Sequence, residues 1–323
     1  MEYLKKYRTY QTAIEKEMNR AVKKDEFIYT PIRYVLTAGG KRLRPIITLL
    51  ACEAVGGDYK SSLPAAAAIE MLHTFTLIHD DIMDNAEKRR GLRTIHNKWN
   101  TATAILSGDL LAGIAFKTLL NTESKKRLKV ANVFTQSYID VCEGQDLDMD
   151  FAARKNVSLK QYYKMIEKKT AALIAAAARV GGIVGNGTTS QCNSLKSFGL
   201  YLGIAFQIHD DLLDIAGDSK LLGKPAGQDI IEGKKTFLLL KAREVAKGND
   251  NSLLNRVAEH KSIDKKHLER IKSAYLRLGV IECAKEEIKL HIMKAKKELI
   301  KLPESHARDM LEWIANKNLV REK

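Results

Sequence analysis

Apolar residues recur at helical spacing along most of this 323-residue chain, and this periodicity constrains the fold more than any other feature. It is clearest in residues 63–76, 102–120, 131–141, 171–183 and 195–208. Side chains three and four positions apart share one face of a helix, so each stretch predicts a helix with a buried face. The chain has only five prolines, and we find no convincing strand or hairpin pattern. The sequence therefore predicts an all-α bundle whose site is built from side chains on facing helices.

The domain organisation follows from composition. A chain of this length exceeds the common domain size, but no linker rich in proline, glycine or serine and no low-complexity tract divides it. We expect a single large domain over residues 1–323.

Two oily segments carry the same acidic motif, LIHDDIMD at 77–84 and QIHDDLLD at 207–214. On a helix, positions i and i+4 share a face, so Asp80 pairs with Asp84 and Asp210 with Asp214, while the middle aspartate points about 100° aside. Like charges at this spacing, removed from water, require a cation. One such motif is also compatible with ordinary aspartates at a helix end, but its repetition favours a shared role.

Oxygen ligands suit Mg²⁺, which proteins usually hold through one or two carboxylates together with substrate phosphates. Phosphate-binding cations should therefore lie nearby, since Arg binds phosphate oxygens as a fork and Lys as a point charge. Basic residues do follow each motif, and others cluster in GGKRLRP at 39–45: Lys88, Arg89 and Arg90; Lys224, Lys234 and Lys235; Lys41, Arg42 and Arg44. Together they predict a pocket with two acidic walls, bound metal and room for more than one diphosphate. The apolar surroundings indicate that the rest of the substrate is apolar.

Charge and cysteine content narrow the function classes. The formal net charge of +15 suggests an anionic partner, but we find no interleaving of basic and aromatic residues of the kind that binds nucleic acid, so no nucleic-acid partner is expected. The four cysteines lack metal-binding spacing, which favours reduced thiols in a cytoplasmic protein. No run approaches the roughly 18 uninterrupted apolar residues of a membrane span, so we expect no integral membrane segment.

These motifs, in their order and spacing, resemble the trans-isoprenyl diphosphate synthases, or polyprenyl synthetases, of the geranylgeranyl and farnesyl type. GGKRLRP, HDDIMD followed by RRG, EKKT, FQIHDDLLD, and GKPAGQD with GKKT carry the likeness. The resemblance implies antiparallel helices around a deep cavity, usually in a homodimer, with about three Mg²⁺ ions held between the acidic motifs. It implies head-to-tail condensation of isopentenyl diphosphate with an allylic diphosphate through a carbocation, with release of diphosphate.

The same resemblance implies roles for individual residues. Asp80, Asp84 and Asp210 would bind metal, with Asp81 and Asp214 supporting. The allylic diphosphate would be contacted by Arg89, Lys169, Lys224 and Lys234. Isopentenyl diphosphate would be contacted by Lys41, Arg44, His73 and Arg90. Thr170 and Gln207 would lie near the reacting carbons.

Product length should depend on what lies below the first acidic motif. Phe75 precedes Asp80 by five residues, about 7.5 Å along a helix, so its ring could close the cavity, although an aromatic on such an apolar helix is more often a simple core residue. A lone aromatic beside a small residue, here Thr76, resembles the geranylgeranyl pattern. We therefore expect a C20 product, with a C15 product as the alternative.

Three other readings remain open. Glu70-x-x-His73 matches half of a di-iron motif, but no second Glu-x-x-His occurs in the chain. A non-catalytic partner subunit of a prenyl synthase normally has a damaged acidic motif, whereas both are intact here. A basic nucleic-acid binder would show steeply salt-dependent retention on DNA.

Overall fold

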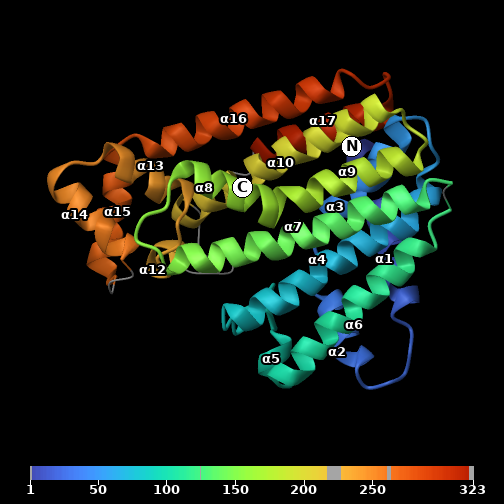
Figure 1. The fold of residues 1–323 in the computed structure, drawn as a ribbon, viewed down its shortest axis with the longest axis horizontal. Helices are drawn as coiled ribbons and strands as arrows, with labels where there is room; N and C mark the ends of the chain where they lie inside the picture. The colour runs from blue at the N-terminus through green and yellow to red at the C-terminus, as the bar shows by residue number, and fades with distance from the viewer. Residues whose placement is uncertain (1, 124, 217–226, 260–262, 320–323) are drawn as a thin grey trace. The chain divides into compact units, whose positions relative to one another are not determined.

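The computed structural model describes residues 2–123, 125–216, 227–259 and 263–319, and these are almost entirely helical (Figure 1). The prediction of an all-α fold is confirmed. The described chain forms two compact units. The first comprises the described residues within 1–138, 173–197 and 298–312, and the second comprises those within 139–172, 198–297 and 313–323. The expectation of a single domain stays a prediction.

The first unit holds the N-terminal helices and the first acidic motif. Its elements are α1 (Glu2–Ala21), α2 (Tyr29–Thr37), α3 (Leu43–Ala54), η1 (Tyr59–Ser62), α4 (Leu63–Met83), β1 (Lys88–Arg89), β2 (Leu92–Arg93), α5 (Ile95–Lys98) and α6 (Thr101–Leu120). It also contains most of α9 (Ala172–Val184) and one end of each of the long helices α7 (Arg127–Ala153) and α10 (Thr189–Ala216).

The second unit holds the second acidic motif, near the end of α10. Its other elements are α8 (Leu159–Ile166), the π-helical segment η2 (Glu167–Ala171), α12 (Gln228–Ile231), α13 (Phe237–Val245), α14 (Gly248–Ala258), α15 (Lys265–Arg277), most of α16 (Val280–Leu299) and the end of α17 (His306–Leu319).

All five predicted helical stretches lie in helices. Residues 63–76, 102–120, 131–141 and 195–208 fall inside α4, α6, α7 and α10, and residues 171–183 run from the last residue of η2 through α9. The prediction of no hairpin is wrong at one place. β1 and β2 pair as a short antiparallel hairpin across Arg90 and Gly91, which both have positive φ values, 52° and 79°. Two positive φ values are what a type I′ turn requires, but Arg-Gly is not the usual Asn-Gly signal, and each strand is too short to show alternation.

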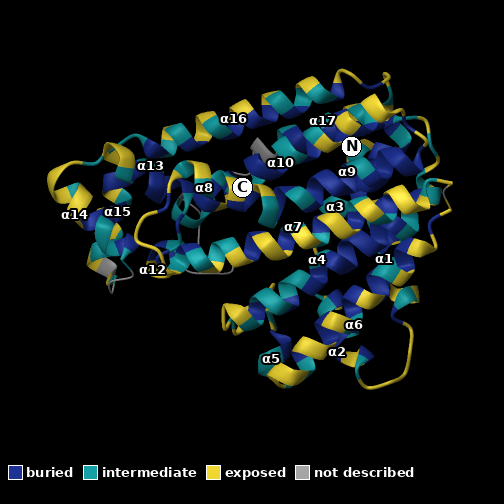
Figure 2. Cartoon of the chain, viewed as in Figure 1, coloured by how far each residue is buried: buried dark blue, intermediate teal, exposed yellow. Residues whose placement is uncertain are grey.

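Small side chains let the helices of the first unit approach closely. Ala65 to Ala68 on α4 are fully buried, and α4 has its most extensive contacts with α6, which lies beside it (Figures 1 and 2). A Cβ on Gly108 of α6 would lie 2.3 Å from His79 Nε2 of α4, so only glycine admits that ring. A Cβ on Gly181 of α9 would lie 2.1 Å from the Thr48 carbonyl oxygen of α3.

Helix α6 is long and apolar enough to cross a membrane, by length and composition alone, and half of its most apolar window is buried. A core helix meets the same criterion. Its exposed face nevertheless carries Ile105, Leu106 and Leu120, which are 43%, 55% and 53% exposed.

Candidate active site

The first acidic motif lies at the C-terminal end of α4. Asp84 caps the helix, and its amide donates to the Asp80 carbonyl oxygen at 2.8 Å, so the i, i+4 relationship holds. Asp80 is half-buried and Asp84 is exposed. Carboxylates at the negative end of a helix dipole are unfavourable unless a cation neutralises them. This location strengthens the expectation of a metal ion.

Asp81 behaves differently from its neighbours. It is only 4% exposed, and its Oδ1 accepts a bond from Arg89 Nε on strand β1 at 2.6 Å. Burial raises the pKa of Asp81, and the Arg89 guanidinium opposes that rise. Arg89 uses Nε for this pair, and its Nη groups take no part in it. The hairpin therefore holds Arg89, which is predicted to contact the allylic diphosphate, against the first acidic motif.

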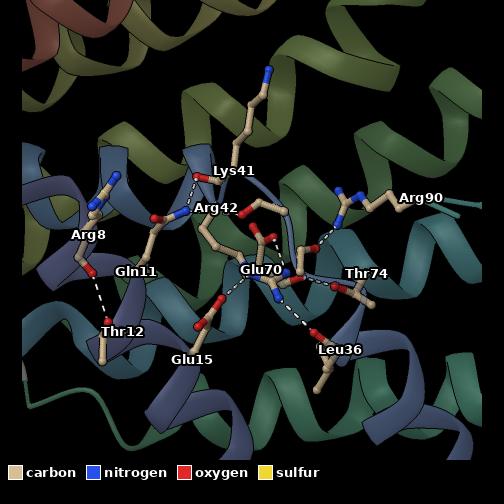
Figure 3. A network of polar contacts seen from close by, with 12 residues as sticks. Arg8, Gln11, Thr12, Glu15, Leu36, Lys41, Arg42, Glu70, Thr74 and Arg90 are labelled. Atoms are coloured by element: carbon tan, nitrogen blue, oxygen red, sulfur yellow. Dashed lines mark hydrogen bonds and ion pairs between the residues drawn. The ribbon is translucent and has the colours of Figure 1, made fainter. Parts of the chain in front are cut away.

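The GGKRLRP loop is held by a buried ion pair (Figure 3). Arg42, 3% exposed and left-handed with φ 49°, places Nη1 3.1 Å from Glu70 Oε1 and donates through Nη2 to the Leu36 carbonyl oxygen. Gln11 Nε2 donates to the Lys41 carbonyl oxygen at 3.4 Å, while the Lys41 side chain extends away from this network (Figure 3). Arg42, one of the basic residues of the motif, is thus structural and orients its neighbours.

Arg44, from the same GGKRLRP motif, and Arg90 form a positive cluster around His73. Burial lowers the pKa of Arg44, and the nearby Arg90 guanidinium adds to that effect. Burial, with Arg44 and Arg90 adding, lowers the pKa of His73 well below its usual value. Arg44 Nε is buried and has no hydrogen-bond partner among the described residues. A Cβ on Gly40 would lie 2.6 Å from Arg90 Nη1, so the glycine admits the Arg90 side chain against the loop. Converging cations with an unsatisfied donor are the arrangement expected of an anion site.

The second acidic motif repeats the pattern on α10. Asp210 is exposed, Asp211 is 5% exposed and Asp214 is half-buried. Burial first, then the nearby Asp229 carboxylate, raise the pKa of Asp214 to about 6, although the Asp229 amide donates to Asp214 Oδ2 at 3.2 Å. In both motifs the middle aspartate is buried while the outer ones reach solvent.

Asp211 is the centre of a hydrogen-bond network. Its Oδ2 accepts from the Tyr162 hydroxyl at 2.7 Å and from the Phe237 amide at 2.9 Å, and its Oδ1 accepts from Gln207 Nε2 at 3.1 Å. The Thr170 hydroxyl then donates to Gln207 Oε1 at 2.7 Å. Burial, with Asp229 adding, raises the pKa of Asp211 to about 7 despite these donors. The structure thus brings Thr170 and Gln207 into direct contact. Their predicted place near the reacting carbons stays a prediction.

The EKKT motif forms a π-helical turn, which the sequence did not predict. Such turns often mark functional sites, and here η2 carries both Lys169 and Thr170. Two glycines leave the space into which this turn packs. A Cβ on Gly144 of α7 would lie 2.2 Å from the Lys169 amide nitrogen, and a Cβ on Gly203 of α10 would lie 2.5 Å from Ala171 Cα. Lys169 Nζ pairs with Asp148 Oδ2 at 2.5 Å. Lys169, which is predicted to contact the allylic diphosphate, is therefore paired with the Asp148 carboxylate in this structure.

The GKKT motif separates two lysines with different environments. Lys234 is half-buried and pairs with Asp229 at 3.3 Å and Glu232 at 2.9 Å. Lys235 is buried and donates to the carbonyl oxygens of Gly233 and Ala258. Lys224, the remaining predicted ligand of the allylic diphosphate, lies outside the described residues.

Phe75 lies in an aromatic cluster below the first motif. Its ring is 5% exposed and meets the rings of His79 and Tyr138 edge-on, at centroid distances of 4.7 and 5.4 Å. Phe116 continues the cluster beside Tyr138. The Thr76 hydroxyl donates to the His73 carbonyl oxygen. This packing is compatible with either reading of Phe75, a core residue or the floor of a cavity.

The donor set fits magnesium bound with substrate. Within the described ranges no group of three or more His, Cys, Asp or Glu side chains is arranged to hold a metal ion alone. Magnesium needs only one or two carboxylates when phosphate oxygens complete its shell. Asp80 and Asp84 in the first unit, and Asp210 in the second, each have a carboxylate that reaches solvent. For the di-iron reading, Glu70 is already paired with Arg42.

A surface hollow in the second unit is separate from the predicted site residues. It has a volume of about 730 Å³ and lies beside α14 and α15, where its lining includes Asp250, Arg270 and Arg277. None of the predicted site residues that the structure describes lines this hollow.

Comparisons with known proteins agree with this arrangement. The family model described as Polyprenyl synthetase matches residues 25–275. The short chain isoprenyl diphosphate synthase of Methanothermobacter thermautotrophicus is 44% identical over 290 residues, covering 90% of this chain and 89% of the relative. The geranylfarnesyl diphosphate synthase of Natronomonas pharaonis is 38% identical, covering 91% and 90%. The crystal structure of geranylgeranyl pyrophosphate synthetase from Pyrococcus horikoshii is 38% identical, with a TM-score of 0.94 and 99% coverage of both chains. The chain therefore belongs to the polyprenyl synthetase family and is an all-α prenyltransferase, a prenyl diphosphate synthase.

Proposed function

We propose that this protein condenses isopentenyl diphosphate with allylic diphosphates of five to fifteen carbons and releases geranylgeranyl diphosphate, the C20 product. The observation that carries the proposal is the repeated pattern of outer aspartates that reach solvent and middle aspartates that are buried, combined with a separate cluster of arginines around His73. Two kinds of anion site suit two diphosphate substrates. Relatives named as geranylgeranyl synthases favour a C20 product. Because another relative is named as a geranylfarnesyl synthase, the assay must also exclude a longer product.

Asp80, Asp84 and Asp210 are the proposed metal ligands, with Asp81 and Asp214 supporting them. Magnesium dependence is general among prenyl diphosphate synthases. Bound magnesium, proposed at about three ions, would neutralise charge developing on the departing diphosphate. Asp81 keeps the Arg89 guanidinium in place through its Nε, so that the Nη groups can bind the same diphosphate.

The remaining steps fall to the chain's own side chains. Arg89, Lys169, Lys224 and Lys234 are proposed to bind the allylic diphosphate. Lys169 and Lys234 would exchange their present acidic partners for phosphate oxygens. Lys41, Arg44 and Arg90 would hold isopentenyl diphosphate with neutral His73, since Arg44 Nε has a hydrogen to donate. Apolar walls exclude water, which would otherwise quench the cation.

Phe75 is the proposed limit on product length, with Thr76 beside it. The edge-on contacts with His79 and Tyr138 would hold the ring across the path of a growing chain. The farnesyl product remains the shorter alternative.

We further propose a cytoplasmic homodimer. The support is the exposed apolar face of α6, formed by Ile105, Leu106 and Leu120, which a second copy would cover. The same face is also compatible with binding to a membrane surface, and light scattering and vesicle sedimentation distinguish a dimer from a membrane-bound protein.

One assay tests the proposed function. Purified protein is incubated with isopentenyl diphosphate and each of the C5, C10 and C15 allylic diphosphates, with and without Mg²⁺, and the products are sized by chromatography. We expect C20 from all three primers and none after chelation. Absence of any elongation by intact, folded protein would support the inactive partner-subunit alternative.

A further inference from the structure

The second acidic motif contains an aspartate that has no assigned role. Asp211 is buried, and its three hydrogen bonds come from Tyr162 on α8, Gln207 on α10 and the amide of Phe237, the first residue of α13. Its neighbour Asp210 is exposed. A carboxylate already surrounded by three protein donors is poorly placed to bind a metal ion.

The direction of each hydrogen bond follows from one group that cannot reverse. A backbone amide can only donate, so the Phe237 N–H makes Asp211 Oδ2 an acceptor. In its ionised form the carboxylate accepts at both oxygens, so Gln207 then turns its NH₂ toward Oδ1. Gln207 Oε1 then faces Thr170, whose hydroxyl gives its single hydrogen to that oxygen.

We propose that Asp211, with Tyr162, sets the polarity of the Thr170–Gln207 pair, so that Thr170 Oγ1 and Gln207 Oε1 present lone pairs rather than hydrogens to the reacting carbons. The inference rests on the proposed function, which puts these two residues near the carbocation. Oxygen lone pairs stabilise a positive carbon, whereas N–H or O–H hydrogens oppose it. Asp211 is thus a positioning residue that acts through Gln207.

The test reverses the polarity and then restores it. In Asp211→Asn, the oxygen of the new side chain must still accept from the Phe237 amide, so its NH₂ group faces Gln207. The Gln207 side chain then has to turn its oxygen toward position 211 and its own NH₂ group toward Thr170. In the double variant Asp211→Asn/Gln207→Glu, both oxygens of the new carboxylate accept, one from the NH₂ group introduced at position 211 and one from Thr170. The total charge of the double variant equals that of the parent. Gln207→Glu alone faces two carboxylates against each other.

We expect Asp211→Asn and Gln207→Glu each to lower kcat by roughly 10²–10³-fold, the usual effect of losing one electrostatic contact to a transition state. The double variant should recover at least about tenfold over either single variant, with little change in the Mg²⁺ concentration that gives half-maximal rate. Tyr162→Phe, which leaves the Phe237 amide in place, should have a smaller effect than Asp211→Asn. Asp146→Asn, at an exposed position on α7, is the matched control and should match the parent.

Melting temperatures measured on the same variants separate the possible failures. The hydrogen-bond polarity predicts that the double variant melts higher than either single variant, whatever the activity. If the melting temperatures follow this pattern but the parent makes no prenyl product, the proposed function fails and the polarity stands. If Asp211→Asn raises the Mg²⁺ requirement and Gln207→Glu does not rescue it, Asp211 is a metal ligand and the inference is wrong. If Asp211→Asn alone does not fold, Gln207→Glu compared with the double variant gives the same test.

Discussion

Arg42 Nη1 lies 3.1 Å from Glu70 Oε1, and both side chains are almost fully buried. Removing one member of such a pair leaves an uncompensated charge in the core, which costs about 3–5 kcal/mol. We therefore expect Arg42→Met to lower the free energy of unfolding by that amount. The double variant Arg42→Met/Glu70→Leu should lower the free energy of unfolding by less, because no buried charge is left without its partner. Lys301→Met, which removes an exposed partner of Glu298, is the matched control and should change stability by under about 1 kcal/mol. Denaturant melts measure all three, and equal losses in both Arg42 variants would contradict a paired charge.

Gly144 and Gly203 are expected to be irreplaceable because they admit the π-helical turn that carries Lys169 and Thr170. Alanine at either position would place a Cβ within 2.2 or 2.5 Å of backbone atoms of that turn. Overpacking of this kind costs about 1–3 kcal/mol, and we expect a loss of kcat as the turn shifts. Gly113→Ala on α6, where nothing lies within 4 Å, should be neutral or stabilising by about 0.5–1 kcal/mol. Thermal melts and steady-state rates of the three variants check this, and a normal rate in Gly203→Ala would show that the turn tolerates displacement.

Phe75→Ala should lengthen the product beyond that of the parent, because removing the ring opens space beneath the first acidic motif. The loss of a buried aromatic also costs about 3–5 kcal/mol, so stability must be measured in parallel. Phe134→Ala removes another buried ring of the first unit and serves as the control. It should lower stability without changing product length. Unchanged chain length in Phe75→Ala would assign that ring to core packing alone.

Lys235 should make stability depend on pH in the alkaline range. Burial lowers its pKa from 10.5 to about 8, and Arg243 adds to the shift. Between these two values the unfolded chain binds a proton that the folded chain has released, so the free energy of unfolding contributed by this group rises as pH rises from about 8 to 10.5. The parent minus Lys235→Met difference should therefore increase over this window by on the order of 2 kcal/mol. Urea melts of both proteins at pH 7.5, 9 and 10 measure this difference in the free energy of unfolding. A difference that does not change with pH would show that Lys235 does not titrate in this window.

Leu106→Glu tests what covers α6. A charge in a subunit interface should give a monomer in light scattering after gel filtration, while the parent elutes as a dimer. Thr101→Glu, also at an exposed position on α6, is a control for added charge. If the parent is monomeric but sediments with phospholipid vesicles, and Leu106→Glu does not, the face binds a membrane instead.

Much of the fold and part of the site could be predicted from the sequence. Helical periodicity located α4, α6, α7, α9 and α10 because burial of one helix face imposes it locally. The i, i+4 aspartate pairs followed from helical spacing. The contact of Thr170 with Gln207 was not predicted, because it joins two segments far apart in the sequence. The hairpin at Arg90 and Gly91 was missed because its turn lacks the usual residues, and the π-helical turn because its cause is close packing by two distant glycines.

The sequence by itself determined the helices and the chemistry of the acidic repeats, since both depend on neighbours three and four positions apart. Only the tertiary structure decided that Asp81 and Asp211 are buried acceptors while the outer aspartates reach solvent. The reason is that the partners of the middle aspartates, Arg89 on a hairpin and Tyr162 and Phe237 on other helices, come from segments whose meeting depends on packing rather than on local spacing.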